Sequence, residues 1–221
     1  MYVLGINGSP RKRGNTAILL QEALRGAEAS GMAAECVHLY DLSFKGCVSC
    51  FACKRKGGKS YGACACRDEL TPLLEKVQRA DALVLASPIY FMHLTACMRA
   101  FLERLLYPYL SYTKDYASLF PRKLPVACLY TMNLHEAQAK SCGLSDALRV
   151  QETFLAKVFG SVISYAAYDT YQFDNYDDYV ATSFDAAEKA RRRDEQFPLD
   201  KKEAYLLGRR LFSENTPTAA L

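Results

Sequence analysis

Two hydrophobic patterns alternate along this chain. Continuous apolar runs such as Ala82–Ala86 are typical of strands buried on both faces of a parallel sheet. Between the runs, apolar residues recur at helical spacing, as in Leu94–Leu110, where Met98, Leu102 and Leu105 share one face. The predicted strands are Tyr2–Asn7, Cys36–Tyr40, Asp81–Ser87, Leu124–Met132 and Ser161–Ala167. The predicted helices are Ala17–Ala29, Asp68–Arg79, Leu94–Leu110, Ser145–Phe159, Phe184–Arg193 and Asp200–Ser213, with Pro198 separating the last two.

Five strands joined by helices predict an α/β fold. Because crossovers between parallel strands are right-handed, we expect a doubly wound three-layer sandwich with strand order 2-1-3-4-5. The 221 residues are expected to form a single domain, with a cysteine-rich loop inserted at 46–67 and a helical extension from about residue 177. In such a sheet, ligands bind beyond the carboxyl ends of the strands, between the first and third strands, where the order reverses.

The turn after the first predicted strand has the composition of an anion site. It reads Gly8-Ser9-Pro10-Arg11, then Gly14-Asn15-Thr16, and a helix follows at once. The free N–H groups and the positive dipole end of that helix point at the turn, and the Ser, Asn and Thr side chains add donors. The spacing fits neither a Walker loop nor a dinucleotide fingerprint. It predicts a cup for one terminal phosphate, with an ordinary, well-capped strand–helix turn as the alternative.

The segment after the third predicted strand should face the same crevice. It reads Ser87-Pro88-Ile89-Tyr90-Phe91-Met92, a stiff loop with flat apolar side chains. Such a loop suits a planar ring whose edges are bound by backbone groups. Taken alone, the pattern is more typical of a hydrophobic lid over a sheet. Together with the phosphate cup it favours a bound mononucleotide.

These two motifs, in this order and about eighty residues apart, resemble the NAD(P)H-dependent FMN reductase group of the flavodoxin-like superfamily, over roughly 1–162. The resemblance implies a flavodoxin-like fold and bound FMN. It assigns the FMN phosphate to Ser9, Arg11, Gly14, Asn15 and Thr16, and the isoalloxazine ring to Pro88, Ile89, Tyr90 and Phe91. Thr131 and Asn133, with Met132 and Leu134, would close the far side of the ring. Members of the group often have Gly where Met92 stands, so a bulkier side chain is expected beside the ring.

A second motif lies in the inserted loop. Cys47, Cys50 and Cys53 have the Cys-x₂-Cys-x₂-Cys spacing of iron–sulfur ligands, and Cys64 and Cys66 follow. The region resembles the cysteine loop of iron–sulfur flavoproteins, in which the fourth ligand usually follows more closely. Three interpretations stay open: a [4Fe–4S] cluster on the first three cysteines and Cys64 or Cys66, free or redox-active thiols, and a zinc site. The basic residues of the loop would lower the pKa of nearby thiols; they are Lys54, Arg55, Lys56 and Lys59.

Composition and charge limit the partners and the cellular compartment that we expect for this protein. The net charge of +4 is too small to indicate nucleic acid as a partner, and no apolar run approaches the length of a membrane span. Nine cysteines without an export signal predict a reducing cytoplasm. Cys36, Cys97 and Cys128 lie in apolar patterns and are expected to be structural. Lys189 and the arginines after it are expected on a solvated helix face, with attraction of an NADPH phosphate as the alternative.

The resemblance implies an FMN-dependent oxidoreductase. Hydride would pass from NAD(P)H through bound FMN to free flavin or to a small acceptor such as a quinone, nitro or azo compound, and no acid–base or nucleophile set is needed. The alternative is an iron–sulfur flavoprotein that carries electrons from a ferredoxin-like donor. A third class is a thiol-based redox sensor that has lost the flavin. The resemblance also favours a homodimer or a tetramer.

Overall fold

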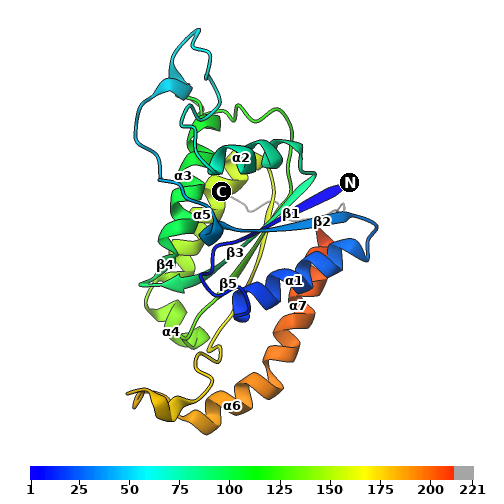
Figure 1. The fold of residues 1–221 in the computed structure, drawn as a ribbon, viewed down its shortest axis with the longest axis vertical. Helices are drawn as coiled ribbons and strands as arrows, with labels where there is room; N and C mark the ends of the chain where they lie inside the picture. The colour runs from blue at the N-terminus through cyan, green and yellow to red at the C-terminus, as the bar shows by residue number, and fades with distance from the viewer. Residues whose placement is uncertain (212–221) are drawn as a thin grey trace.

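A six-residue strand at the N-terminus lies near the middle of a parallel sheet in the computed structural model, which describes residues 1–211. The sheet has the order β2-β1-β3-β5-β6, and Figure 1 shows its twist. This is the predicted order 2-1-3-4-5 once the short strand β4 (His93–Leu94), which pairs only with β3, is set aside. The predicted flavodoxin-like topology is therefore confirmed. The parallel strands are β1 (Tyr2–Asn7), β2 (Ala33–His38), β3 (Ala82–Tyr90), β5 (Val126–Thr131) and β6 (Val162–Ala167).

Helices cover both faces of the sheet and build two cores. On one face, α1 (Asn15–Glu28) and α7 (Phe197–Arg210) pack on side chains such as Val84 and Leu129. On the other, α2 (Leu70–Arg79), α3 (Ala96–Tyr109) and α5 (Leu144–Phe159) pack on Leu83 and Leu85. Because β1, β3 and β5 are buried on both faces, their sequences are apolar without alternation.

The predicted boundaries differ from the observed ones in a few places. β3 runs on to Tyr90, because Ile89 and Tyr90 pair with β4 in a hairpin. Pro198 does not separate the last two helices. It lies in the first turn of α7, where a missing N–H costs nothing, while α6 (Ala186–Glu195) ends just before. The predicted end of the last helix, Ser213, lies outside the described residues. A short helix α4 (Glu136–Ser141) was not predicted.

Two glycines allow α7 to lie directly on α1. A Cβ on Gly26 would lie 2.0 Å from the carbonyl oxygen of Tyr205, and one on Gly208 would lie 1.8 Å from that of Ala23. The helix backbones therefore touch at this crossing, and α7 completes the core on its face of the sheet.

Among residues 1–211, no helix combines the length and hydrophobicity that crossing a bilayer requires.

Two segments project from opposite ends of the molecule. The loop between β2 and α2, which contains the five clustered cysteines, extends beyond the far end of α3 (cyan in Figure 1). The segment between β6 and α6 extends from the other end. It folds on its own aromatic rings: Phe173 stacks on Tyr179 with ring centroids 4.0 Å apart, and Tyr176 is buried among its neighbours. Aromatic packing thus orders the projection between β6 and α6.

Candidate functional site

The turn after β1 is held open by its own side chains. The Ser9 N–H donates to Asn7 Oδ1 at 2.9 Å, and the Arg11 N–H donates to Ser9 Oγ at 3.1 Å. Gly8 lies against α3, where a Cβ would come within 2.9 Å of the Met98 side chain. Gly14 caps α1 and has no side chain that could accept from the first helical turn. The N–H groups at this helix end therefore remain available to an anion.

The loop after β3 is a tight hairpin. Its two turn residues, Phe91 and Met92, both have positive φ, at 48° and 67°. Two left-handed residues form the turn that joins antiparallel strands most tightly, and glycine adopts this conformation without strain. A glycine at position 92 would therefore adopt this turn without strain, whereas Met92 adopts it with a positive φ that is unfavourable for its side chain. The Met92 side chain is half-buried against the core, with its sulfur 3.9 Å from Cys142 Sγ.

The loop after β5 is held against a segment that follows β6. The Thr170 N–H donates to the Met132 carbonyl oxygen at 2.9 Å, and Asn133 Nδ2 donates to Gln172 Oε1 at 2.9 Å. The same segment crosses to the phosphate turn. There Arg11 Nη1 donates to the Gln172 carbonyl oxygen and Asn15 Nδ2 to the Tyr171 carbonyl oxygen, each at 2.7 Å. Residues 170–172 therefore link two loops of the site, and we call them the strap.

A single cavity of about 160 Å³ lies where these loops meet. Of the eleven residues expected to bind FMN, ten line it, and Phe91 does not, because it is fully exposed at the hairpin tip. Met92 also lies outside the lining, which also includes Met132 and the strap. The strap was not foreseen because it follows the last strand and carries no motif. The ten lining residues are Ser9, Arg11, Gly14, Asn15, Thr16, Pro88, Ile89, Tyr90, Thr131 and Asn133.

A buried lysine fixes the third loop. Lys189, on α6, is 4% exposed and donates to Asp169 and to Asn133 Oδ1. His135 Nδ1 lies 3.4 Å from the other oxygen of Asp169. The expectation of a solvated face is therefore wrong for Lys189, because its charge is paired inside the protein. It instead helps to orient Asn133, whose amide lines the cavity.

The five cysteines of the inserted loop line a second cavity. Cys47, Cys50, Cys53, Cys64 and Cys66 surround it together with Tyr107 and Pro108 of α3. Lys54 anchors the middle of the loop, because its ammonium donates to the carbonyl oxygens of Tyr107 and Leu110 at the end of α3. Cys47 and Cys66, which are nineteen positions apart in the chain, thus line the same cavity.

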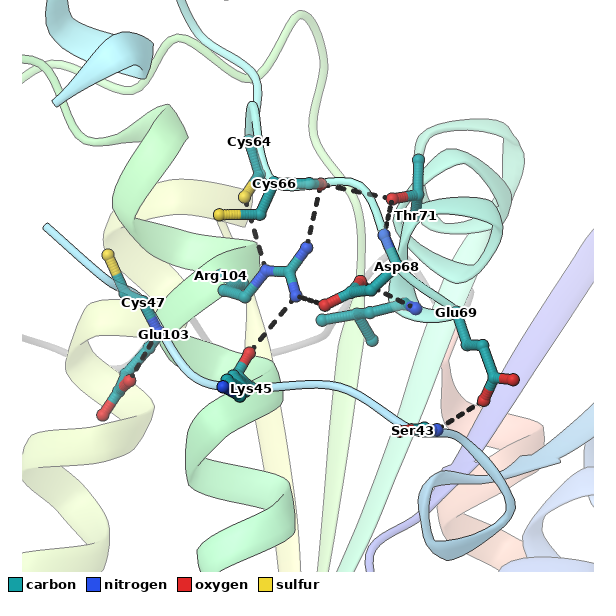
Figure 2. A network of polar contacts seen from close by, with 11 residues as sticks. Ser43, Lys45, Cys47, Cys64, Cys66, Asp68, Glu69, Thr71, Glu103 and Arg104 are labelled. Atoms are coloured by element: carbon teal, nitrogen blue, oxygen red, sulfur yellow. Dashed lines mark hydrogen bonds and ion pairs between the residues drawn. The ribbon is translucent and has the colours of Figure 1, made fainter. Parts of the chain in front are cut away.

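Arg104 joins the two ends of this loop, as Figure 2 shows. Its guanidinium donates to the carbonyl oxygens of Lys45 and Cys66, at 3.2 and 3.1 Å, and pairs with Asp68. Its Nε donates to Cys64 Sγ at 3.4 Å. The neighbouring residue Glu103 accepts from the Cys47 N–H at 3.0 Å.

Burial determines the direction in which the pKa values of two loop thiols, Cys53 and Cys66, shift. It raises the pKa of Cys53 and of Cys66, and the nearby Lys54 and Arg104 only partly oppose the effect. The expectation that the basic residues lower thiol pKa values is therefore wrong for these two. Outside the loop, burial raises the pKa of Cys128 to about 12, as expected for a structural thiol, whereas Cys36 and Cys97 are only half-buried.

Within residues 1–211, no three His, Cys, Asp or Glu side chains have the arrangement of a single-ion metal site. Thiolates on one zinc lie about 4 Å apart, whereas the ligands of a cluster bind separate irons and stand farther apart.

A larger hollow of about 500 Å³ lies between α3 and α5, lined by apolar residues such as Leu106 and Phe154. It shares only Cys47 with the predicted site residues and lacks a helix N-terminus.

Comparison with known proteins agrees with the loop geometry. Residues 1–155 match the family described as NADPH-dependent FMN reductase. The chain belongs to this family. The matched range of this FMN reductase family member includes the phosphate turn and the hairpin.

The curated relatives of this FMN reductase family member are iron–sulfur flavoproteins. One from Archaeoglobus fulgidus is 40% identical over 109 residues, which are 49% of this chain and 47% of the relative. One from Methanocaldococcus jannaschii is 36% identical over 104 residues, 47% of this chain and 51% of the relative. The chain is thus aligned with about half the length of the curated relatives that it matches.

Solved structures of the same fold extend over nearly the whole chain. The NAD(P)H:quinone oxidoreductase from Methanothermobacter marburgensis superposes with a TM-score of 0.71 at 15% identity, over 96% of this chain and 98% of that one. The azoreductase from Bacillus anthracis gives 0.65 at 13% identity, over 95% and 99%. At such identities these structures confirm the fold of this family member.

Proposed function

We propose that the protein binds FMN in the cavity between the phosphate turn, the hairpin and the strap, and uses it to oxidise NAD(P)H. The observation that carries this proposal is that ten predicted residues from three separate loops line one cavity at the N-terminus of α1. The bound FMN would then pass the electrons to an acceptor, which would be free FMN or a small molecule such as a quinone, nitro or azo compound.

The donor set of the cavity fits a phosphate monoester. The Ser9 and Thr16 hydroxyls and the first N–H groups of α1 are neutral donors, and Arg11 supplies one charge. A volume of about 160 Å³ encloses a phosphate and its ester rather than a whole mononucleotide. The isoalloxazine would therefore extend along Pro88, Ile89 and Tyr90, with Thr131 and Asn133 on its far side.

When bound, FMN supplies the hydride and electron chemistry itself. The residues of this chain bind it and hold its ring in place. Lys189 contributes by holding Asn133, and the strap contributes by holding Arg11 and Asn15. No titratable side chain is assigned a proton-transfer role.

The cysteine cavity favours a second candidate, an iron–sulfur flavoprotein that takes electrons from a ferredoxin-like donor. All five cysteines of the loop line one cavity, and a [4Fe–4S] cluster takes four thiolates, which Cys47, Cys50, Cys53 and Cys64 would supply. The two sites share helix α3: its N-cap Thr95 donates to the Gly8 carbonyl oxygen, and Arg104 lies about 14 Å farther along the helix axis. A single rigid element would thus support both cofactors.

The first test is the ultraviolet–visible spectrum of protein purified without air, with flavin and iron assayed on the same sample. A flavin spectrum without iron supports the reductase and assigns the cysteines to thiol or structural roles. About four irons per flavin support the cluster. A colourless protein that also fails to take up added FMN contradicts both candidates.

A second test separates the two candidates if both cofactors are present. NADPH, NADH and chemically reduced ferredoxin are mixed in turn with the oxidised protein, and flavin bleaching is followed. The reductase predicts bleaching by a nicotinamide, and predicts that Cys50→Ser, which removes a cluster ligand, leaves this bleaching intact. The electron carrier predicts bleaching by ferredoxin alone, and its loss in Cys50→Ser.

A further inference from the structure

We propose that Arg104 selects Cys64, rather than Cys66, as the fourth ligand of the cysteine loop and holds it in place. This inference rests on the cluster proposed above. It concerns a positioning residue, because Arg104 would act on the cluster through the sulfur of Cys64.

Arg104 is unusual for an arginine in being only 2% exposed. A buried guanidinium needs partners for its N–H groups and for its charge. Asp68 supplies the countercharge, and three further acceptors complete the set: the carbonyl oxygens of Lys45 and Cys66 and the sulfur of Cys64. All four partners flank or belong to the cysteine loop (Figure 2).

The two candidate ligands contact Arg104 differently. Cys64 presents its sulfur to the guanidinium, with Nε donating at 3.4 Å. Cys66 presents its backbone carbonyl oxygen to Nη2 at 3.1 Å. The contact to Cys64 therefore fixes the position of a sulfur, whereas the contact to Cys66 fixes only the chain. Hydrogen bonds to ligand sulfurs stabilise the reduced state of iron–sulfur clusters and orient the ligands.

The length of the loop explains why such a clamp is needed. Ten residues separate Cys53 from Cys64, and they include Gly57 and Gly58. A long, glycine-containing connection costs more entropy to close than a short one and leaves its end poorly positioned. Arg104 holds the chain just before the loop at Lys45 and near the end of the loop at Cys66, from one side chain on α3. Arg104 thereby positions Cys64, which a shorter connection from Cys53 would otherwise do.

Cysteine variants test the choice of ligand. After anaerobic reconstitution with iron and sulfide, Cys64→Ser is expected to retain at most half the iron of the wild type, and Cys66→Ser nearly all of it. Equal losses in the two variants, or a larger loss in Cys66→Ser, would overturn the proposal. Both substitutions are small, so the comparison holds even if changes at the buried arginine impair folding.

Arginine variants test the clamp. Arg104→Lys keeps the charge but cannot reach all four acceptors, and Arg104→Met keeps the volume without any donor. Both are expected to lower iron content at least twofold and to shift the midpoint potential of the remaining clusters to more negative values, measured by redox titration with electron paramagnetic resonance. Arg67→Met, an exposed arginine beside Cys66, is the matched control and should change neither.

An unchanged potential in both Arg104 variants contradicts the positioning role. In the metal-free protein, the same variants are expected to speed tryptic cleavage within residues 54–67, a readout that needs no cofactor. Wild-type protein that takes up no iron overturns the cluster and this inference together. Wild-type protein with four irons and a dispensable Cys64 overturns the inference alone.

Discussion

Thr16 Oγ1 and Thr131 Oγ1 lie 2.7 Å apart and share a hydrogen bond, although 115 positions separate them in the chain. Thr16 lies in the first turn of α1, and Thr131 ends β5. Both are almost completely buried, and both line the cavity proposed for FMN. The bond therefore ties the phosphate turn to the loop expected on the far side of the ring.

Thr131→Val should weaken FMN binding about fivefold, because the loss of one hydrogen bond of about 1 kcal/mol leaves the buried Thr16 hydroxyl without its partner. Titration of the flavin-free protein with FMN, followed by quenching of flavin fluorescence, measures the dissociation constant. Thr131→Ser keeps the hydroxyl and is the control. Equal affinity in Thr131→Val and the wild type would show that the bond does not shape the site.

Phe91→Gly should raise the stability of the flavin-free protein by about 0.5–1 kcal/mol, because Phe91 has a φ of 48° and its exposed side chain loses no packing. For a domain of this size, the melting temperature would rise by about 1–3 °C. Phe91→Ala removes the same ring but keeps the strain, so it should melt like the wild type. If both variants shift equally, the ring rather than the backbone is responsible.

The Arg104–Asp68 pair should make stability depend on pH in the acid range. Burial of the Asp68 carboxyl raises its pKa, but the Arg104 guanidinium more than offsets this, so the pKa lies below the ordinary value for an aspartate. A carboxyl with a lowered folded-state pKa stabilises the fold above its unfolded pKa and loses that effect as pH falls through the folded value.

Asp68→Asn is accordingly expected to cost about 2–3 kcal/mol at pH 7, because it leaves the buried guanidinium without a countercharge. The difference from the wild type should shrink as the pH falls below about 4. Urea unfolding at a series of pH values measures both effects. Asp194→Asn, in an exposed pair with Arg193, should change stability little at any pH. A pH-independent cost for Asp68→Asn would assign its role to packing.

Gly208→Ala should destabilise the protein by about 1–3 kcal/mol, because the new methyl group would lie 1.8 Å from the Ala23 carbonyl oxygen and force α7 away from α1. The direction of the stability change is diagnostic, since replacing an exposed helical glycine by alanine normally stabilises a protein by about 1 kcal/mol. Chemical denaturation followed by circular dichroism gives the free energy of unfolding. A stabilised variant would mean that the two helices do not touch.

The sequence predicted the sheet because its signal is strong and local. Ala82–Ala86 is apolar throughout since it is covered on both faces, and the phosphate turn carries its donors within nine residues. The hairpin was not predicted because no Gly or Asn marks positions 91 and 92, where the backbone has positive φ. Tertiary contacts hold Met92 there instead, and they have no signature in the local sequence.

The strap and the buried charges were missed for a different reason. Gln172 and Tyr171 accept from Arg11 and Asn15, respectively, through their backbone carbonyl oxygens, and any residue has a carbonyl oxygen. Lys189 lies in a strongly charged helix, so its sequence gives no sign that it is buried. Contacts of this kind depend on which distant segments meet, and they become visible only with the fold.

The match to the family ends at residue 155, inside α5, but the folded unit does not. β6 still has to pair along β5, and α7 has to cover the apolar face of α1. A protein shortened at the limit of the shared sequence would expose an unpaired sheet edge and an uncovered helix, and both promote aggregation. The inherited portion and the smallest portion that can fold are therefore different lengths of this polypeptide. A transplant of the proposed FMN site into another protein would have to include β6 and α7, which lie beyond the residues that the family model matches.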